Sequence, residues 1–157
     1  MKTSFLTGLF LILSITTISA QKAETSLANL FNSYITLKNA LTQDNSDLAS
    51  KSADNFIKNI SVVDYKVLSE GNINILKKQA SEIADSRSIE KQRSAFKNLS
   101  ENITVIAEQF PISDSSIYVQ YCPMAEASWL SENKEIKNPY YGASMLNCGS
   151  VKRTITK

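Results

Sequence analysis

The stretch ETSLANLFNSYITLKNAL, residues 24–41, repeats apolar side chains at spacings of three and four. Its apolar positions are Leu27, Leu30, Phe31, Tyr34, Leu37 and Leu41. This spacing places them in one stripe along one face of an α-helix. A helix over about residues 24–41 is therefore predicted, with its apolar face turned to other elements.

Three further amphipathic helices follow. They are predicted from residue 46 or 47 to 60, over 72–86, and from Ser88 as N-cap to about Gln109, where Pro111 stops the last one. The chain holds only 4 Gly and 3 Pro, which favours helices over a turn-rich sandwich. The predicted fold is all-α: an antiparallel four-helix bundle over about 24–110, then a short irregular, β-containing cap over about 111–157.

The cap has a different character from the helices. Residues 117–122, IYVQYC, are rich in strand-forming side chains and predict one short extended segment. Five aromatic residues gather in the cap: Tyr118, Tyr121, Trp129, Tyr140 and Tyr141. A second small core packed on the helices is favoured over a ring around a ligand, because aromatic side chains dominate core burial.

The N-terminus predicts a secretory signal peptide over residues 1–20. Lys2 precedes a mostly apolar, uncharged run from Phe5 to Ile18, and the small residues Ser19 and Ala20 fit a cleavage site. One exported domain, residues 21–157, is therefore expected, periplasmic or secreted and without stable membrane insertion after cleavage. No Cys stands at the cleavage point, so no lipid anchor is expected.

Charge and composition argue against two classes of function. With 17 basic and 15 acidic side chains, the chain lacks the electrostatic footprint of a nucleic-acid-binding protein. The sequence contains no His, the commonest general base, and no Gly-rich phosphate loop. We therefore expect neither an enzyme nor a nucleic-acid partner.

The only two cysteines each lie close to a methionine. Cys122 and Met124 flank Pro123, and Met145 precedes Cys148, which Gly149 follows. Thiolates and thioethers are soft ligands that favour Cu(I) and similar ions. Pro123 would stiffen the loop, and Gly149 would allow a sharp backbone turn.

The same two cysteines have a second interpretation. Paired cysteines of exported proteins commonly form disulfides. A Cys122–Cys148 disulfide would stabilise the cap by about 3–4 kcal/mol in the chain-entropy model. The residues themselves leave both interpretations open.

The cap segments 118–125, 129–131, 134–142, 145–146 and 148–151 resemble a bacterial family typical of the Bacteroidota, the domain-of-unknown-function family 3347. Upstream, similar patterns stand at Tyr34, Leu37, Lys38, Ala40, Leu41, Gln92, Arg93, Phe96, Leu99 and Ser100. The resemblance extends roughly from Leu27 to Ile155. Such domains occur alone after a signal peptide, or fused to periplasmic adaptor subunits of heavy-metal efflux systems.

The resemblance implies a function for the Cys/Met residues. Cys122 and Met124 would contact Cu(I) or Ag(I), with Met145 and Cys148 as partner ligands. The protein would buffer the ion or hand it to an efflux adaptor or another periplasmic protein. Relatives often carry a His near Ser94 and Ala95, which this chain lacks. The alternative is a non-catalytic interaction module with a Cys122–Cys148 disulfide and no metal.

Overall fold

The computed structural model describes the backbone of residues 7–156 and the side chains of residues 21–156. Four helices come first: α1 (Thr7–Thr42), α2 (Ser46–Ser61), α3 (Glu70–Ala84) and α4 (Ile89–Gln109). Three strands and a short 3-10 helix follow: β1 (Ile117–Cys122), β2 (Ala127–Ser131), η1 (Gly142–Met145) and β3 (Ser150–Ile155). All four predicted helices are present, and β1 has the predicted bounds.

Side-chain caps explain where three of the helices begin. Asn45 Oδ1 accepts a hydrogen bond from the Leu48 N–H at 2.9 Å at the start of α2. Ser69 has the same role for α3. Ser88 Oγ accepts from the Lys91 N–H at 3.3 Å, which confirms the predicted N-cap of α4. Each cap satisfies an N–H group that has no partner within its own helix.

Helix α1 begins earlier than expected. It starts at Thr7 instead of about Glu24, because extending an existing helix adds one hydrogen bond for each residue fixed. Residues 1–6 of the predicted signal peptide lie outside the described residues. Among the helices of the described part, none combines the length and apolar character needed to cross a membrane.

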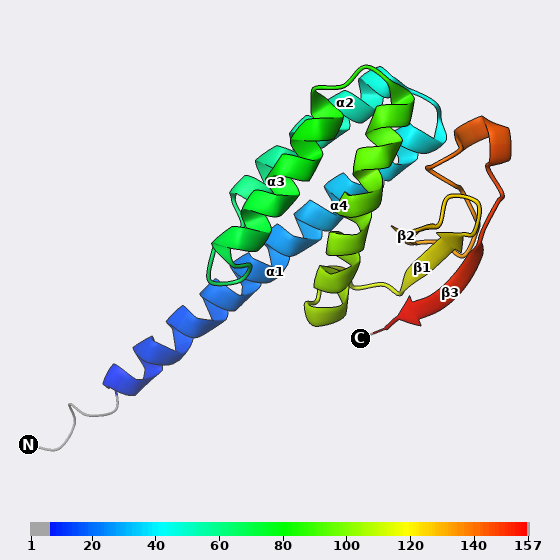
Figure 1. Cartoon of the computed structure of the whole chain (residues 1–157). Coiled ribbons are helices and arrows are strands. Elements are labelled where there is room, and N and C mark those ends of the chain that lie inside the picture. The colour runs from blue at the N-terminus through cyan, green and yellow to red at the C-terminus, as the bar shows by residue number, and fades with distance from the viewer. Residues whose placement is uncertain (1–6, 157) are drawn as a thin grey trace, which may run out of the picture.

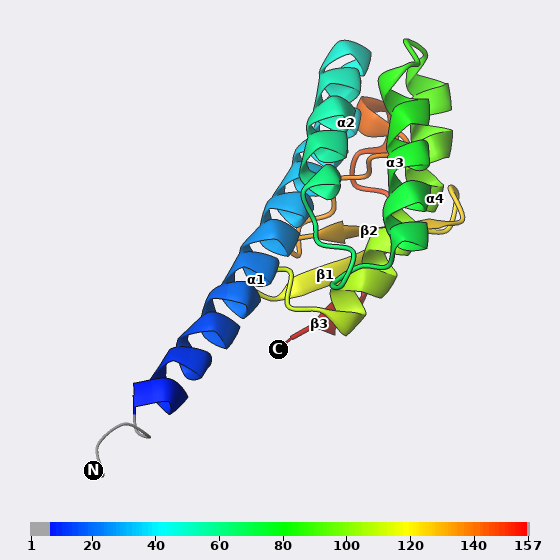
Figure 2. The ribbon, with the colours of Figure 1, turned by 90° about the vertical axis from the view of Figure 1, so that its left-hand side faces the viewer.

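The helices run alternately up and down, and each packs on its neighbour in the sequence (Figure 1). Helices α1 and α4 touch each other only sparsely, and the three strands lie at this α1–α4 side (Figure 2). Strand β2 packs directly on α4. The molecule is thus four helices followed by a small three-stranded sheet, which is the β-structure of the predicted cap.

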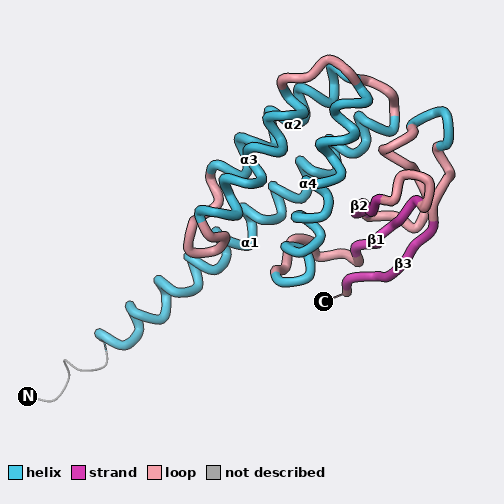
Figure 3. The backbone as a smooth tube through the Cα atoms, in the orientation of Figure 1, coloured by secondary structure: helices cyan, strands magenta, loops and turns pink. Residues whose placement is uncertain are grey.

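The sheet has the order β2-β1-β3 with antiparallel neighbours, so β1 is central. Val119 faces Arg153 and Gln120 faces Val151, which leaves Lys152 as an extra residue in β3. Strands β2 and β3 were not predicted. Most of the chain between them is irregular (Figure 3).

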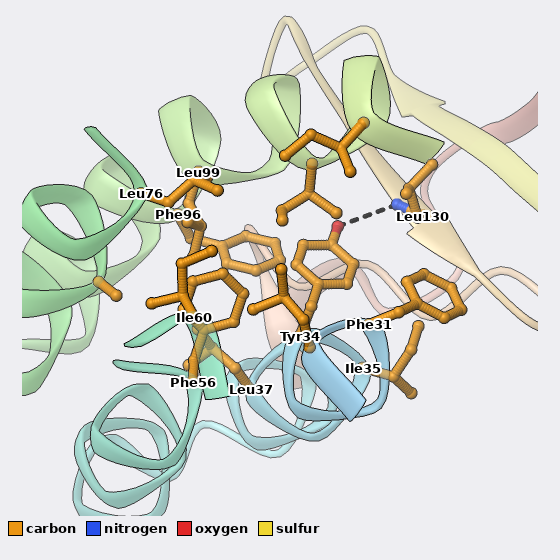
Figure 4. Close-up of a cluster of buried hydrophobic side chains, with 14 of the residues drawn as sticks. Phe31, Tyr34, Ile35, Leu37, Phe56, Ile60, Leu76, Phe96, Leu99 and Leu130 are labelled. Atoms are coloured by element: carbon orange, nitrogen blue, oxygen red, sulfur yellow. Dashed lines mark hydrogen bonds between the residues drawn. The ribbon is translucent and has the colours of Figure 1, made fainter. Parts of the chain in front are cut away.

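The core centres on Tyr34 of α1, whose side chain is fully buried. Its hydroxyl lies 2.6 Å from Ser100 Oγ of α4. It also accepts a hydrogen bond from the Leu130 N–H of β2 at 3.0 Å (Figure 4). Phe31 and Phe96 stack near its ring. Burial raises the pKa of Tyr34 far above its ordinary value, so the hydroxyl keeps its proton.

We expect Tyr34→Phe to lower the free energy of unfolding by about 1–3 kcal/mol, because the Leu130 N–H then stays buried without a partner. Chemical denaturation measures this change. Tyr65→Phe is the matched control, since Tyr65 is 68% exposed. Equal midpoints for the two variants would contradict the role assigned to the Tyr34 hydroxyl.

Candidate functional site

The two cysteines meet at one end of the sheet. Cys122 is the last residue of β1, and Tyr121 beside it pairs with Ser150, the first residue of β3. Cys148 lies two positions before Ser150. The antiparallel pairing of β1 with β3 therefore brings together two cysteines that are far apart in the sequence.

The sulfur atoms of Cys122 and Cys148 are 3.1 Å apart, and both residues are free thiols. Cys122 is fully buried, whereas Cys148 is half-buried. The pair is therefore reachable from the Cys148 side.

The surroundings favour one thiolate in this pair. Burial raises the pKa of the Cys122 thiol, but a hydrogen bond from the Cys148 thiol opposes this. Hydrogen bonds from the Ala125 N–H, the Asn138 amide and the Met124 N–H lower it further, so the pKa lies below its ordinary value. The hydrogen bond to Cys122 raises the pKa of Cys148, as does burial. Cys122 thus ionises first, and Cys148 retains its proton.

Asn138 organises the loop that presents Cys148. It is fully buried, and its amide Nδ2 donates to the Cys148 carbonyl at 2.8 Å. Its Oδ1 accepts from the Tyr140 N–H at 2.8 Å, and its own N–H donates to the Leu146 carbonyl at 2.8 Å. The Asn138 side chain therefore satisfies two backbone groups that no strand or helix pairs.

Gly149 adopts a backbone conformation that other residues rarely adopt, as expected for a sharp turn after Cys148. Its φ is +144°, and a Cβ there would meet Trp129 Cη2 and the Tyr121 carbonyl oxygen, both at 2.9 Å. Trp129 is fully buried under this turn. A glycine is thus required for the chain to leave Cys148 and enter β3.

A second anchor fastens η1 to the helices. Arg93 of α4 pairs with Asp44, which follows α1, and donates to the Pro139 carbonyl at 2.9 Å. Asp44 Oδ2 accepts from the Ala143 N–H at 2.9 Å. Hydrogen bonds from the Ala143 N–H and from Arg93 hold the pKa of Asp44 below its usual range. A Cβ on Gly142 would overlap these two charged side chains.

Three of the five aromatic side chains of the cap join the core, Trp129 within it and Tyr140 and Tyr141 packed against it. Trp129 packs edge-on against Tyr140, and Tyr140 packs against Phe96 of α4. The Tyr140 hydroxyl donates to the Ser128 carbonyl at 2.6 Å. The remaining two, Tyr118 and Tyr121, are half-buried.

The two methionines are close to the cysteines in the sequence: Met124 is two residues after Cys122, and Met145 is three residues before Cys148. Met124 follows β1 and is 65% exposed, with its carbonyl accepting from the Tyr141 hydroxyl at 3.1 Å. Met145 ends η1, and its carbonyl accepts from the Cys148 N–H at 3.0 Å. Among the side chains of residues 21–156, no group of three or more His, Cys, Asp and Glu residues is placed to hold a metal ion. Of these residue types, a metal at the cysteine pair would have only the two cysteine sulfurs as ligands.

The sequence interpretation did not include Asn138 or Gln120 among the site residues. Gln120 of β1 is fully buried, and its Nε2 donates to the carbonyls of Asn133, Lys134 and Glu135. Gln120 and the Asn138 Nδ2 bond to carbonyls ten or more residues away, which no local pattern reveals. The contact of Asn138 Oδ1 with Tyr140 is local, and the Asn138-Pro139 pair is a turn signal in the sequence.

Comparison with known families identifies the class of protein. The family described as "Protein of unknown function (DUF3347)" matches residues 30–115, and the chain belongs to this family. The matched stretch is shorter than the expected extent from Leu27 to Ile155, and it ends before β1 and the cysteine pair. No curated protein and no solved structure matched the chain.

Replacing one cysteine should shift the pKa of the remaining thiol, and the two replacements should shift it in opposite directions. Cys148→Ala removes a hydrogen bond to the Cys122 thiolate, so the pKa of Cys122 should rise. Cys122→Ala removes the partner that raises the pKa of Cys148, so that pKa should fall. Ultraviolet absorbance of the thiolate against pH measures both. Shifts of the same sign would contradict an arrangement in which the Cys148 thiol donates a hydrogen bond to the Cys122 thiolate.

Gly149→Ala should lower the free energy of unfolding by about 1–3 kcal/mol, because any residue with a Cβ would be strained at this φ. Gly71→Ala is the matched control, since a Cβ there meets only Ser69 Oγ at 4.0 Å. That control should leave stability unchanged or raise it by up to about 1 kcal/mol. Thermal denaturation compares the two, and equal effects would be inconsistent with the constrained turn.

Proposed function

We propose that this protein is an exported soft-metal-binding protein, which binds Cu(I) or Ag(I) and passes the ion to a heavy-metal efflux adaptor or another periplasmic protein. The four helices would form an antiparallel bundle that acts as scaffold, and residues 1–20 would be a cleaved signal peptide. The observation that carries the proposal is the approach of Cys122 Sγ to within 3.1 Å of Cys148 Sγ.

The electrostatics of the pair support metal binding. Metal ions bind thiolates, not thiols, and the lowered pKa of Cys122 makes its thiolate available closer to neutral pH. Binding of a cation beside Cys148 would then release the proton that this thiol retains. Two thiolates suit a soft monovalent ion, and Met124 and Met145 are the nearest thioethers along the chain.

The exposure of the ligands supports transfer of the ion. Cys122 is buried and would keep its bond to the ion longer, while Met124 is 65% exposed. A ligand of a second protein could bind the ion and displace the exposed thioether before the bond from the buried thiolate to the ion breaks. A buried ligand and an exposed ligand on one turn are thus suited to handover.

A second candidate function rests on the same distance. Sulfur atoms 3.1 Å apart need only a small movement to reach the bonded separation of about 2.05 Å. Thiol–disulfide exchange with an external disulfide would join Cys122 to Cys148 and release that reagent as two thiols. The product would be a disulfide-stabilised interaction module without metal.

The test is anaerobic titration of the reduced protein, residues 21–157, with Cu(I) against a competing chelator. We expect one ion per chain. Loss of one residue that only orients a metal ligand typically lowers metal affinity about 10–100-fold. Because Cys122 and Cys148 are the proposed ligands themselves, Cys122→Ser and Cys148→Ser should each lower the Cu(I) affinity about 100-fold or more. Met124→Leu should cost less, and Ser144→Ala in η1 is the control without effect.

Free thiols are counted on the protein as isolated, alongside the titration. Affinity unchanged in Cys122→Ser, with the fold retained by circular dichroism, would sink the metal proposal. Absence of Cu(I) binding together with no free thiol would instead favour the disulfide-stabilised module.

A further inference from the structure

A polar cavity of about 430 Å³ lies between α1 and the segment after β2, apart from the cysteine pair. Its volume falls within the range of small-molecule sites, about 300–1,000 Å³. The side chains that the argument uses are Lys38, Asn39 and Thr42 of α1, and Glu132, Asn133 and Lys137 opposite them.

Lys38 is the unusual member of this lining. It is only 5% exposed, and among the described residues it makes no hydrogen bond and no ion pair. Lysine side chains are almost never this buried unless paired, because removing the ammonium group from water is costly. The Lys38 Nζ atom keeps some contact with solvent, so the ammonium group opens onto the cavity, where an anion can reach it.

The other charges around the cavity leave Lys38 available. Lys137 Nζ lies 3.2 Å from Glu135 Oε2, so these two charges pair with each other. Burial lowers the pKa of Lys38 to about 8, Glu132 raises it, and Lys137 lowers it. Lys38 is thus still largely protonated at neutral pH, and Glu132 is a carboxylate that attracts it from a distance.

The walls of the cavity are fixed by buried amides. Gln120 Nε2 donates to the Asn133, Lys134 and Glu135 carbonyls at 2.9, 3.3 and 3.1 Å. Leu146, on a third side, accepts from the Asn138 N–H at 2.8 Å. A cavity with fixed walls loses little conformational freedom when a ligand binds.

We propose that this cavity binds a small organic anion, with its carboxylate or phosphate group on the Lys38 ammonium and its polar body against Asn39, Thr42 and Asn133. Carboxylate and phosphate share the oxyanion that a lysine recognises as a point charge. The ion pair gains strength because Lys38 itself is only 5% exposed.

The test uses the reduced, metal-free protein, residues 21–157, with inorganic phosphate and succinate as probes. Carbon NMR of labelled lysine follows the Lys38 pKa, and amide NMR follows the wall residues. A bound anion stabilises the charged amine, so the pKa of Lys38 should rise from about 8, with amide shifts at Asn133 and Glu135. A response to either probe supports the site and tells which anionic group it accepts.

Lys38→Met should weaken probe binding about tenfold or more, because a hydrogen bond to a charged group is lost. The exposed Lys51 is the control site, and Lys51→Met should bind normally. Glu132→Gln keeps Lys38 and removes the competing carboxylate, so it should bind more tightly even if Lys38→Met fails to fold. No pKa change with either probe, or equal amide shifts in Lys38→Met, would overturn the proposal. Because no metal is present, the outcome is independent of Cu(I) binding.

Discussion

The Tyr34 hydroxyl connects helix α1 to helix α4 and strand β2, three elements that are separate along the backbone. It lies against Ser100 of α4 and accepts from the Leu130 N–H of β2. Because β2 is at the edge of the sheet, that N–H points away from β1 and into the dry core, where an unpaired donor is costly. The tyrosine therefore fixes β2 on the helices. Strand β1 and the cysteine at its end take their positions from β2.

The helices follow from the sequence because their signals are local. Leu27, Leu30 and Phe31 repeat at helical spacing, and Ser88 caps the helix that starts beside it. Strands β2 and β3 depend instead on pairing with a distant strand. The exposed β3, SVKRTI, shows no alternation of apolar and polar residues, and β2 is only five residues long. The early start of α1 was also missed, since a signal-like run and a helix share the same apolar residues.

The sequence draws attention to Cys122 and Cys148 but does not show that they meet. Their approach depends on Asn138, Gly149 and the buried Trp129. Each of these acts through space on a backbone group or on a turn. Lys38 was open to prediction, because it stands four residues after Tyr34 and three before Leu41, on the apolar stripe of α1. A charge on such a stripe indicates either a buried partner or a cavity.

Strand β1 carries both Gln120 and Cys122, two positions apart, where side chains of a strand point to the same face. Gln120 holds one wall of the polar cavity, and Cys122 is half of the thiol pair. A ligand that displaced Cys122 would act on the same strand that positions Gln120. Such an effect would be a free-energy coupling between the two proposed sites, and thermodynamic linkage would make it reciprocal. Strand β1 would thus be the structural element that the two proposed sites share.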